Sequence, residues 1–237
     1  MWYTVSCMKR KKPVITSQEA IEEILSRGVH EVIDAKNLRA KLLKGTPLRI
    51  KLGIDPTGEN IHIGHAAPLL KLRDFQDLGH TAILIIGNAT AEIGDTSDKE
   101  SERPMLSAAD VKRNEKTYLK QLGKIIDLSN TEVHHNADWL NKVKFRDLGM
   151  MADQFSVSDF IARDNIKRRI TTGTRVSLRE VLYPIMQGYD SVATRADVEL
   201  GGIDQRFNLL AGRTLQAHAG QESQDVVVLR YITDGEG

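Results

Sequence analysis

The sequence has little of what several classes of protein depend on. Its single cysteine, Cys7, excludes an intrachain disulfide and makes a reducing cytoplasm the default expectation. Its longest apolar run, residues 82–86, is far too short to span a bilayer, and no apolar segment of a secretion signal follows the start. Its net charge of +1 at pH 7 argues against a surface that binds nucleic acid over its whole extent.

The composition is sufficient for a globular fold. The chain of 237 residues can form one large or two modest domains, and its 41% hydrophobic and 27% charged residues are typical of a soluble protein. The basic run at residues 9–12 lies near a terminus, where a solvated tail explains it better than a localisation signal or an RNA contact.

The hydrophobic pattern predicts an α/β fold. A strand over 48–54, a helix over 63–78 and a buried strand over 81–86 form a βαβ unit, which requires a parallel sheet with a right-handed crossover. Residues 88–107 are polar and predict a loop. Helices are also expected over 17–27 (capped by Ser17), around 38–43, and over 107–127, 145–169, 178–189 and 203–216. Further strands are expected over 132–135, 197–200 and 226–231.

The most informative stretch follows the first strand of the βαβ unit. Asp55 and Thr57 stand in a Pro/Gly turn, and His62, Gly64 and His65 then open a helix in the order His-x-Gly-His. Histidines three apart project from one side of a helix, and glycine lets a phosphate approach the backbone. The arrangement can bind a nucleoside triphosphate and stabilise charge at its α-phosphate, which is the chemistry of adenylyl transfer. Two surface histidines after a turn are the alternative, because so short a motif also occurs by chance.

A polar loop follows the second strand of the unit. It holds Thr90, Asp95, Lys99 and Arg103. The carboxylate can bind an ammonium group and the two cations can bind pyrophosphate, although charged loops are mostly solvated.

Two further groups lie nearer the C-terminus. Tyr183, Gln187 and Asp190 share one helical face that can bind an amino acid, with Asp190 accepting a hydrogen bond from a substrate hydroxyl. The alternative is a core tyrosine beside a polar helix end. After the next strand, Gly202 clears space for a nucleotide and Asp204 can hold ribose hydroxyls, unless the acid only complements the helix dipole.

With these groups in this order, the sequence resembles the bacterial kind of tyrosyl-tRNA synthetase, a family of class I aminoacyl-tRNA synthetases. The resemblance extends from about residue 19 to residue 235. It is carried by KLGIDPT at 51–57, HIGH at 62–65, IGD at 93–95, LYPIMQGYDS at 182–191 and ADVELGGIDQRFN at 196–208. The last two stretches are typical of the tyrosine enzymes rather than of the whole class.

The resemblance implies a Rossmann-like (HUP-type) parallel sheet flanked by helices. Residues 1–45 would be an N-terminal tail and helices, and residues 46–237 a truncated catalytic domain with a helical insert at about 120–170 that contributes to a homodimer interface. The family activates L-tyrosine with magnesium–ATP, without a tightly bound metal, and passes the tyrosine from tyrosyl-adenylate to tRNA(Tyr). A cytoplasmic location away from membranes is expected.

The resemblance also implies roles for the residues named above. His62 and His65, with Thr57, would be catalytic. The α-ammonium of tyrosine would be held by Asp95, Tyr183 and Gln187, and the phenolic hydroxyl by Asp190, in a pocket lined by Thr90. ATP would contact the two histidines and Asp55, Gly64, Gly202, Asp204, Gln205, Lys99 and Arg103. Of these, Asp204 would bind the ribose, and the lysine and arginine would face the pyrophosphate.

Several departures from the family pattern bear on activity. The KMSKS loop, which clamps the ATP phosphates in the transition state, would be expected just after residue 237, and the anticodon-binding region is absent from these residues. The loop after Asp95 reads Thr96-Ser97-Asp98, where many relatives have proline, a small residue and glycine. Lys51 stands where other members carry a tyrosine that makes a second contact with the substrate hydroxyl. We therefore expect a catalytic portion that binds tyrosine, binds ATP weakly and activates tyrosine poorly in isolation.

Two alternatives stay open. One is another HxGH nucleotidyltransferase, such as a tryptophanyl-tRNA synthetase or a small adenylyltransferase. The run at 183–191 argues against tryptophan, and a small adenylyltransferase would not need that helical face. The other is a non-catalytic remnant that binds tyrosine and ATP.

Overall fold

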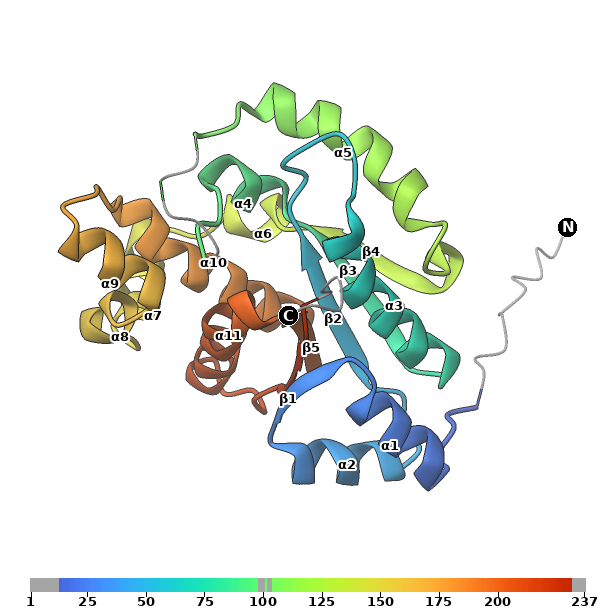
Figure 1. Ribbon diagram of the computed structural model, residues 1–237. Helices are drawn as coiled ribbons and strands as arrows, with labels where there is room; N and C mark the ends of the chain where they lie inside the picture. The colour runs from blue at the N-terminus through green and yellow to red at the C-terminus, as the bar shows by residue number, and fades with distance from the viewer. Residues whose placement is uncertain (1–12, 98–100, 102–103, 232–237) are drawn as a thin grey trace, which may run out of the picture.

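A six-stranded sheet in the order β1-β6-β5-β2-β3-β4 forms the centre of the molecule (Figure 1). The computed structural model describes residues 13–97, 101 and 104–231. The strands are β1 (Val29–Ile33), β2 (Arg49–Ile54), β3 (Thr81–Ile86), β4 (Thr131–His135), β5 (Val198–Gly202) and β6 (Asp225–Leu229). Neighbouring strands are parallel except β1 and β6, which run antiparallel. The predicted α/β fold with a largely parallel sheet is confirmed.

Helices cover both faces of this sheet. They are α1 (Gln18–Ser26), α2 (Ala35–Leu43), α3 (Ile63–Asp77), α4 (Asn88–Ile93), α5 (Ala108–Leu122), α6 (Ala137–Leu140), α7 (Phe145–Ala152), α8 (Val157–Ile161), α9 (Asp164–Thr171), α10 (Leu178–Thr194) and α11 (Arg206–His218). Two single 3-10 turns, η1 (Leu128–Asn130) and η2 (Ile203–Gln205), precede β4 and α11. No helix in the described part of the chain is long and apolar enough to cross a membrane.

The sequence predicts no strand between the first two helices, yet β1 forms there. Its five residues, Val29–Ile33, mix two polar side chains with three apolar ones and show no clean alternation of buried and exposed positions. The strand exists because β6 offers an edge to pair with, and that edge comes from about 200 residues further along the chain. Residues before 46 therefore contribute a strand to the same sheet, in addition to the expected helices.

Two helical predictions also need correction. Residues 88–93 form α4 instead of a loop, because tertiary hydrogen bonds support this short helix: the Ala89 N–H donates to Asn136 Oδ1 at 2.9 Å. The stretch 145–169 is divided into α7, α8 and the start of α9, with Ser156 capping the second of these. These short helices lie together to one side of the sheet, beyond α10 (Figure 1).

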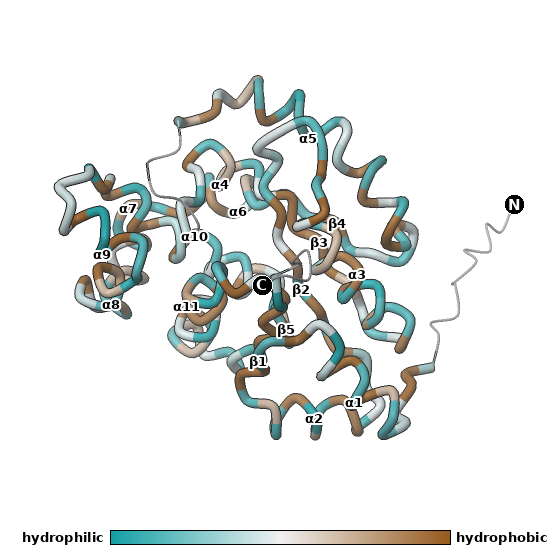
Figure 2. Tube along the Cα trace, in the orientation of Figure 1, coloured by the Kyte–Doolittle hydropathy of each residue, from teal (hydrophilic) through white to brown (hydrophobic). Residues whose placement is uncertain are grey.

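The main core lies between the sheet and the helices α1, α2, α3 and α5. Leu69, Leu72 and Phe75 of α3 are fully buried against β2 and β3, where brown, apolar positions concentrate (Figure 2). The opposite face of the sheet packs against α10 and α11, through residues such as Leu209 and Val226. With both faces covered, β3 is apolar and buried at every position after its first residue, Thr81.

His80, directly before β3, gives the fold a defined response to acid. Its imidazole is 2% exposed, and its Nδ1 accepts a hydrogen bond from the Leu48 N–H at 3.2 Å. Burial lowers the pKa of His80 from 6.5 to about 4. Because the unfolded chain binds this proton at higher pH, we expect about 3 kcal/mol of stability to be fully present above pH 6.5 and lost between pH 6.5 and 4. Urea unfolding of the wild type and of His80→Gln at pH 7, 5.5 and 4.5 tests this, since the variant should lack that loss. Equal pH slopes would contradict it.

Candidate active site

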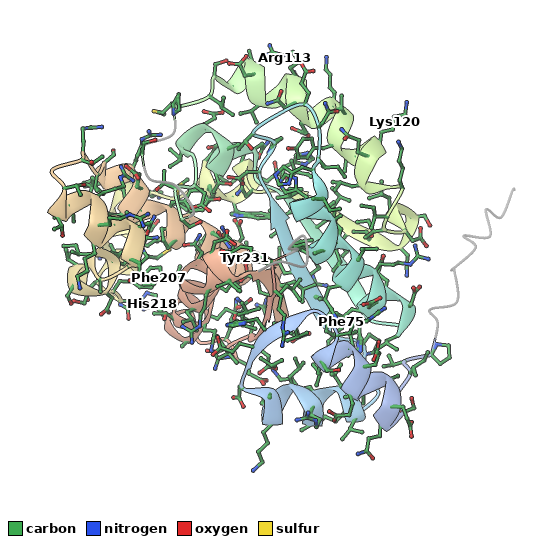
Figure 3. All side chains as sticks on the ribbon, in the orientation of Figure 1. Phe75, Arg113, Lys120, Phe207, His218 and Tyr231 are labelled. Atoms are coloured by element: carbon green, nitrogen blue, oxygen red, sulfur yellow. The ribbon has the colours of Figure 1, made fainter. Side chains whose placement is uncertain are left out.

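A cavity of about 420 Å³ opens at the carboxyl ends of β2, β3 and β5. This is the edge at which ligands bind in open parallel sheets. The structure brings nearly all the predicted site residues to this cavity, whose lining includes Asp55, Thr57, His62, Gly64, His65, Thr90, Asp95, Tyr183, Gln187, Asp190, Gly202, Asp204 and Gln205. Lys99 and Arg103 lie outside the described residues. Tyr231, which also lines the cavity, is exposed and is labelled in the middle of the view in Figure 3.

The two histidines form a stacked pair at the start of α3. Their ring centroids are 3.8 Å apart and their planes 25° from parallel. The His62 N–H donates to His65 Nδ1 at 3.2 Å, which leaves the proton of a neutral His65 ring on Nε2. A Cβ at Gly64 would lie 3.0 Å from the His62 ring, so glycine leaves room for the stack. The positive end of the helix and these ring N–H groups suit an anion.

Asp55 is held at the end of β2 by two hydroxyl donors. Thr90 Oγ1 donates to Oδ1 at 2.8 Å, and the Tyr183 hydroxyl donates to Oδ2 at 2.9 Å. Burial raises the pKa of Asp55 to about 7, and the charges of Asp95 and Asp190 add to this effect. Because the Tyr183 hydroxyl donates its proton to Asp55, its oxygen can accept a hydrogen bond from a ligand. Sequence reasoning missed Gly87, where a Cβ would overlap both Asp55 and Thr90.

Asp95 is fixed by its own loop and by η2. Ser97 donates to it twice, from its N–H to Oδ1 at 2.9 Å and from its hydroxyl to Oδ2 at 2.6 Å. Gln205 Nε2 bridges Asp95 Oδ2 at 2.7 Å and Asp204 Oδ2 at 2.8 Å. Ser97 therefore orients this carboxylate, and Gln205 joins it to the predicted ribose site.

Asp190 lies at the base of the cavity and is 3% exposed. Trp139 Nε1 donates to its Oδ1 at 2.8 Å, and Asn136 Nδ2 donates to its Oδ2 at 3.3 Å. Burial raises the pKa of Asp190 to about 7, although Lys51 and these two donors oppose the rise. Sequence reasoning missed Trp139 and Asn136. Their position directly after β4, beside β3, is a signal that could have found them.

Lys51 does not line the cavity. It is fully buried, and its Nζ lies 2.8 Å from Glu199 Oε1 and donates to Ser191 Oγ at 2.6 Å. It therefore does not substitute directly for the tyrosine that other members of the resembled family carry at this position. The side chains that donate hydrogen bonds to Asp190 are instead Trp139 and Asn136.

Residues 43–237, most of the chain, match the family of the class I tRNA synthetases for tryptophan and tyrosine. The chain belongs to this family. A tyrosine–tRNA ligase of Dehalococcoides mccartyi is 46% identical over 221 residues, which are 93% of this chain and 56% of that protein. The chain thus spans little more than half the length of the curated relatives it matches. The relatives that this comparison names are tyrosine–tRNA ligases.

Solved structures show the same fold. The C-terminally truncated mitochondrial tyrosyl-tRNA synthetase of Coccidioides posadasii aligns with a TM-score of 0.77 and 24% identity, over 93% of this chain and 69% of that one. The tyrosyl-tRNA synthetase of Archaeoglobus fulgidus, solved in complex with L-tyrosine, aligns with a TM-score of 0.72 and 19% identity, over 91% of this chain and 64% of that one. The Rossmann-like fold of class I synthetases is therefore confirmed.

Proposed function

We propose that this chain is the catalytic region of a tyrosine–tRNA ligase, and that its cavity forms tyrosyl-adenylate from L-tyrosine and ATP. The observation that carries the proposal is Asp190, a buried carboxylate held by Trp139 and Asn136 at the base of the cavity. A phenolic hydroxyl that reaches Asp190 gains a charge-assisted hydrogen bond, whereas a ligand without it leaves a buried carboxylate without that donor.

The other end of the amino acid meets a group of acceptors. Asp95 and the Tyr183 oxygen face the cavity from neighbouring elements, and Gln187 stands one helical turn from Tyr183. Burial raises the pKa of Asp55, and repulsion from the carboxylates of Asp95 and Asp190 raises it further. The α-ammonium of tyrosine would relieve this repulsion, so binding favours an amino acid with its positive charge at this end.

The histidine pair would act on ATP. A carboxylate oxygen of tyrosine attacks the α-phosphorus, the bond from that phosphorus to the bridging oxygen breaks, and pyrophosphate leaves. N–H donors of His62 and His65 at the start of α3 can stabilise the negative charge that develops on the α-phosphate. Asp204 in η2, which lines the cavity, would hold the ribose hydroxyls, and magnesium would accompany ATP as part of the substrate.

The proposal extends to partners through the relatives. Tyrosine would pass from the adenylate to tRNA(Tyr), in a cytoplasmic homodimer. Support for the homodimer comes from large exposed apolar side chains on α7, α8 and the start of α10, namely Phe145, Met150, Val157, Ile161 and Leu178. Such side chains are typical of a surface that another chain covers.

Tyrosine-dependent exchange between ATP and pyrophosphate tests the proposal. We expect exchange with L-tyrosine but not L-tryptophan, and its loss in His65→Ala. His30→Ala, which changes an exposed histidine on β1, is the matched control and should exchange like the wild type. Saturable tyrosine binding without exchange, abolished by Asp190→Ala, would reduce the function to binding. The absence of both exchange and tyrosine binding would overturn the proposal.

A further inference from the structure

Lys51 and Glu199 form an ion pair in the interior of the protein. They are 0% and 1% exposed, and their Nζ and Oε1 atoms are 2.8 Å apart. The pair is fixed by the sheet itself, because Lys51 and Glu199 stand opposite each other in the parallel register of β2 and β5. Stability alone does not explain such a pair, because desolvation costs offset much of its attraction and apolar replacements are often as stable.

The pair is connected to the helix that carries the predicted tyrosine contacts. Lys51 Nζ donates to the Gln187 carbonyl at 3.3 Å and to Ser191 Oγ at 2.6 Å, one turn apart on α10. Glu199 accepts from Gln187 Nε2 at 3.4 Å and from the Ser191 hydroxyl at 3.1 Å. The ion pair thus binds α10 on both sides of Asp190.

The neighbouring helix α11 leaves space for this cluster. A Cβ at Gly212 would lie 2.7 Å from Ser191 Oγ and 3.2 Å from Glu199 Oε2, so a side chain there would displace the cluster. At Gly188 a Cβ would lie 2.9 Å from the Ala211 carbonyl carbon, which brings α10 and α11 into close contact. The backbone is therefore shaped around these polar groups.

We propose that the Lys51–Glu199 pair is a specificity-determining device that positions the Gln187–Asp190 face of α10 and sets the electrostatic potential at Asp190. This inference rests on the proposed function, because it assigns the selection of the phenolic hydroxyl to Asp190. Lys51 and Glu199 act through α10 and are positioning residues.

The charges around Asp190 define how the pair acts. Lys51 on β2 attracts negative charge at Asp190, while Glu199 on β5 and Asp55 after β2 repel it. Trp139 contributes an N–H dipole. After burial, Lys51 has the largest influence on the pKa of Asp190, which it lowers, and Glu199 raises that pKa. The two members of the pair therefore shift the charge of Asp190 in opposite directions.

The ratio of the dissociation constants of L-phenylalanine and L-tyrosine, measured from pH 5.5 to 8.5, isolates this effect. Both ligands carry the same ammonium and carboxylate. The titration of the groups that bind them therefore affects both dissociation constants equally and cancels in the ratio. Selectivity for tyrosine should fall with decreasing pH as Asp190 takes up a proton.

We expect the midpoint of this fall to rise by about one pH unit in Lys51→Met and to fall by a similar amount in Glu199→Gln. If Lys51→Met does not fold, comparison of Glu199→Gln with the double variant K51M/E199Q replaces it. Both lack the acidic charge, and the midpoint should be higher in the double variant, which also lacks the cation.

Lys71→Met is the matched control. Lys71 is also a buried lysine, but its Nζ donates to the Ile24 and Arg27 carbonyls at the end of α1. Its loss should lower stability and leave the selectivity midpoint unchanged. Midpoints that stay at the wild-type value, or move together in Lys51→Met and Glu199→Gln, would overturn the inference while leaving tyrosine binding intact. A wild type that does not select tyrosine would overturn the proposed function instead.

Discussion

Replacing Asp190 by asparagine is expected to weaken L-tyrosine binding about ten- to a hundred-fold, because a hydrogen bond to a charged group contributes about 1.5–3 kcal/mol. The amide keeps the shape of the carboxyl and can still accept from Trp139 Nε1, so the cavity should stay formed. L-phenylalanine has no hydroxyl for this contact, and its affinity should change by less than about twofold. Calorimetric titration of both amino acids measures the effect.

Asp197→Asn serves as the control for this substitution. Asp197 precedes β5 at the end opposite the cavity and accepts a hydrogen bond from the Arg49 N–H at 2.8 Å, which asparagine can also accept. Tyrosine should bind this variant as it binds the wild type. Equal losses for tyrosine and phenylalanine in Asp190→Asn would show that the residue supports the cavity as a whole, contrary to the assigned role.

Replacing Arg169 by methionine is expected to lower the free energy of unfolding by about 3–5 kcal/mol, because it leaves a buried carboxylate without its counter-charge. Arg169 is 1% exposed, and its Nη1 lies 2.6 Å from Glu180 Oε2. Glu180 also accepts from Thr96 Oγ1 at 2.7 Å. The pair thus connects α9, α10 and the residue that follows Asp95. Urea unfolding at pH 7 measures the loss.

Two further variants make the stability prediction specific. The double variant R169M/E180Q removes both charges and should recover part of the loss. Arg39→Met breaks the exposed pair of Arg39 with Glu22 and should lower stability much less, because solvent screens exposed charges. An Arg169→Met variant no less stable than Arg39→Met would contradict the prediction.

The parts of the site that lie close together in sequence could be predicted. Tyr183, Gln187 and Asp190 share a helical face by spacing alone, and the histidine motif is placed by the strand before it and the helix that it opens. The convergence of these groups followed from a general property of parallel sheets, whose carboxyl ends meet at one edge. The order of the strands after residue 48, and the long helices α3, α5, α10 and α11, followed from hydrophobic periodicity.

The groups that support the site could not be predicted in the same way. Trp139 contacts Asp190, and Glu199 contacts Lys51, across long stretches of chain. Such contacts depend on which strands are neighbours and in what register they pair, and no local pattern specifies either. Gly87 is similar, because its lack of a side chain matters only once Asp55 and Thr90 lie against it.

The antiparallel edge strand has a consequence for synthesis of the protein on the ribosome. Within the described sheet β1 pairs with β6 alone. Val29 therefore cannot pair until Leu229, 200 residues later in the chain, has been synthesised. At about 5–20 residues per second, this interval is about 10–40 s. A nascent strand left so long without a partner invites pairing with other chains, and β1 limits that risk by being five residues long and by carrying Glu31, which Arg206 later neutralises. The sheet is therefore completed last at the edge whose sequence was made first.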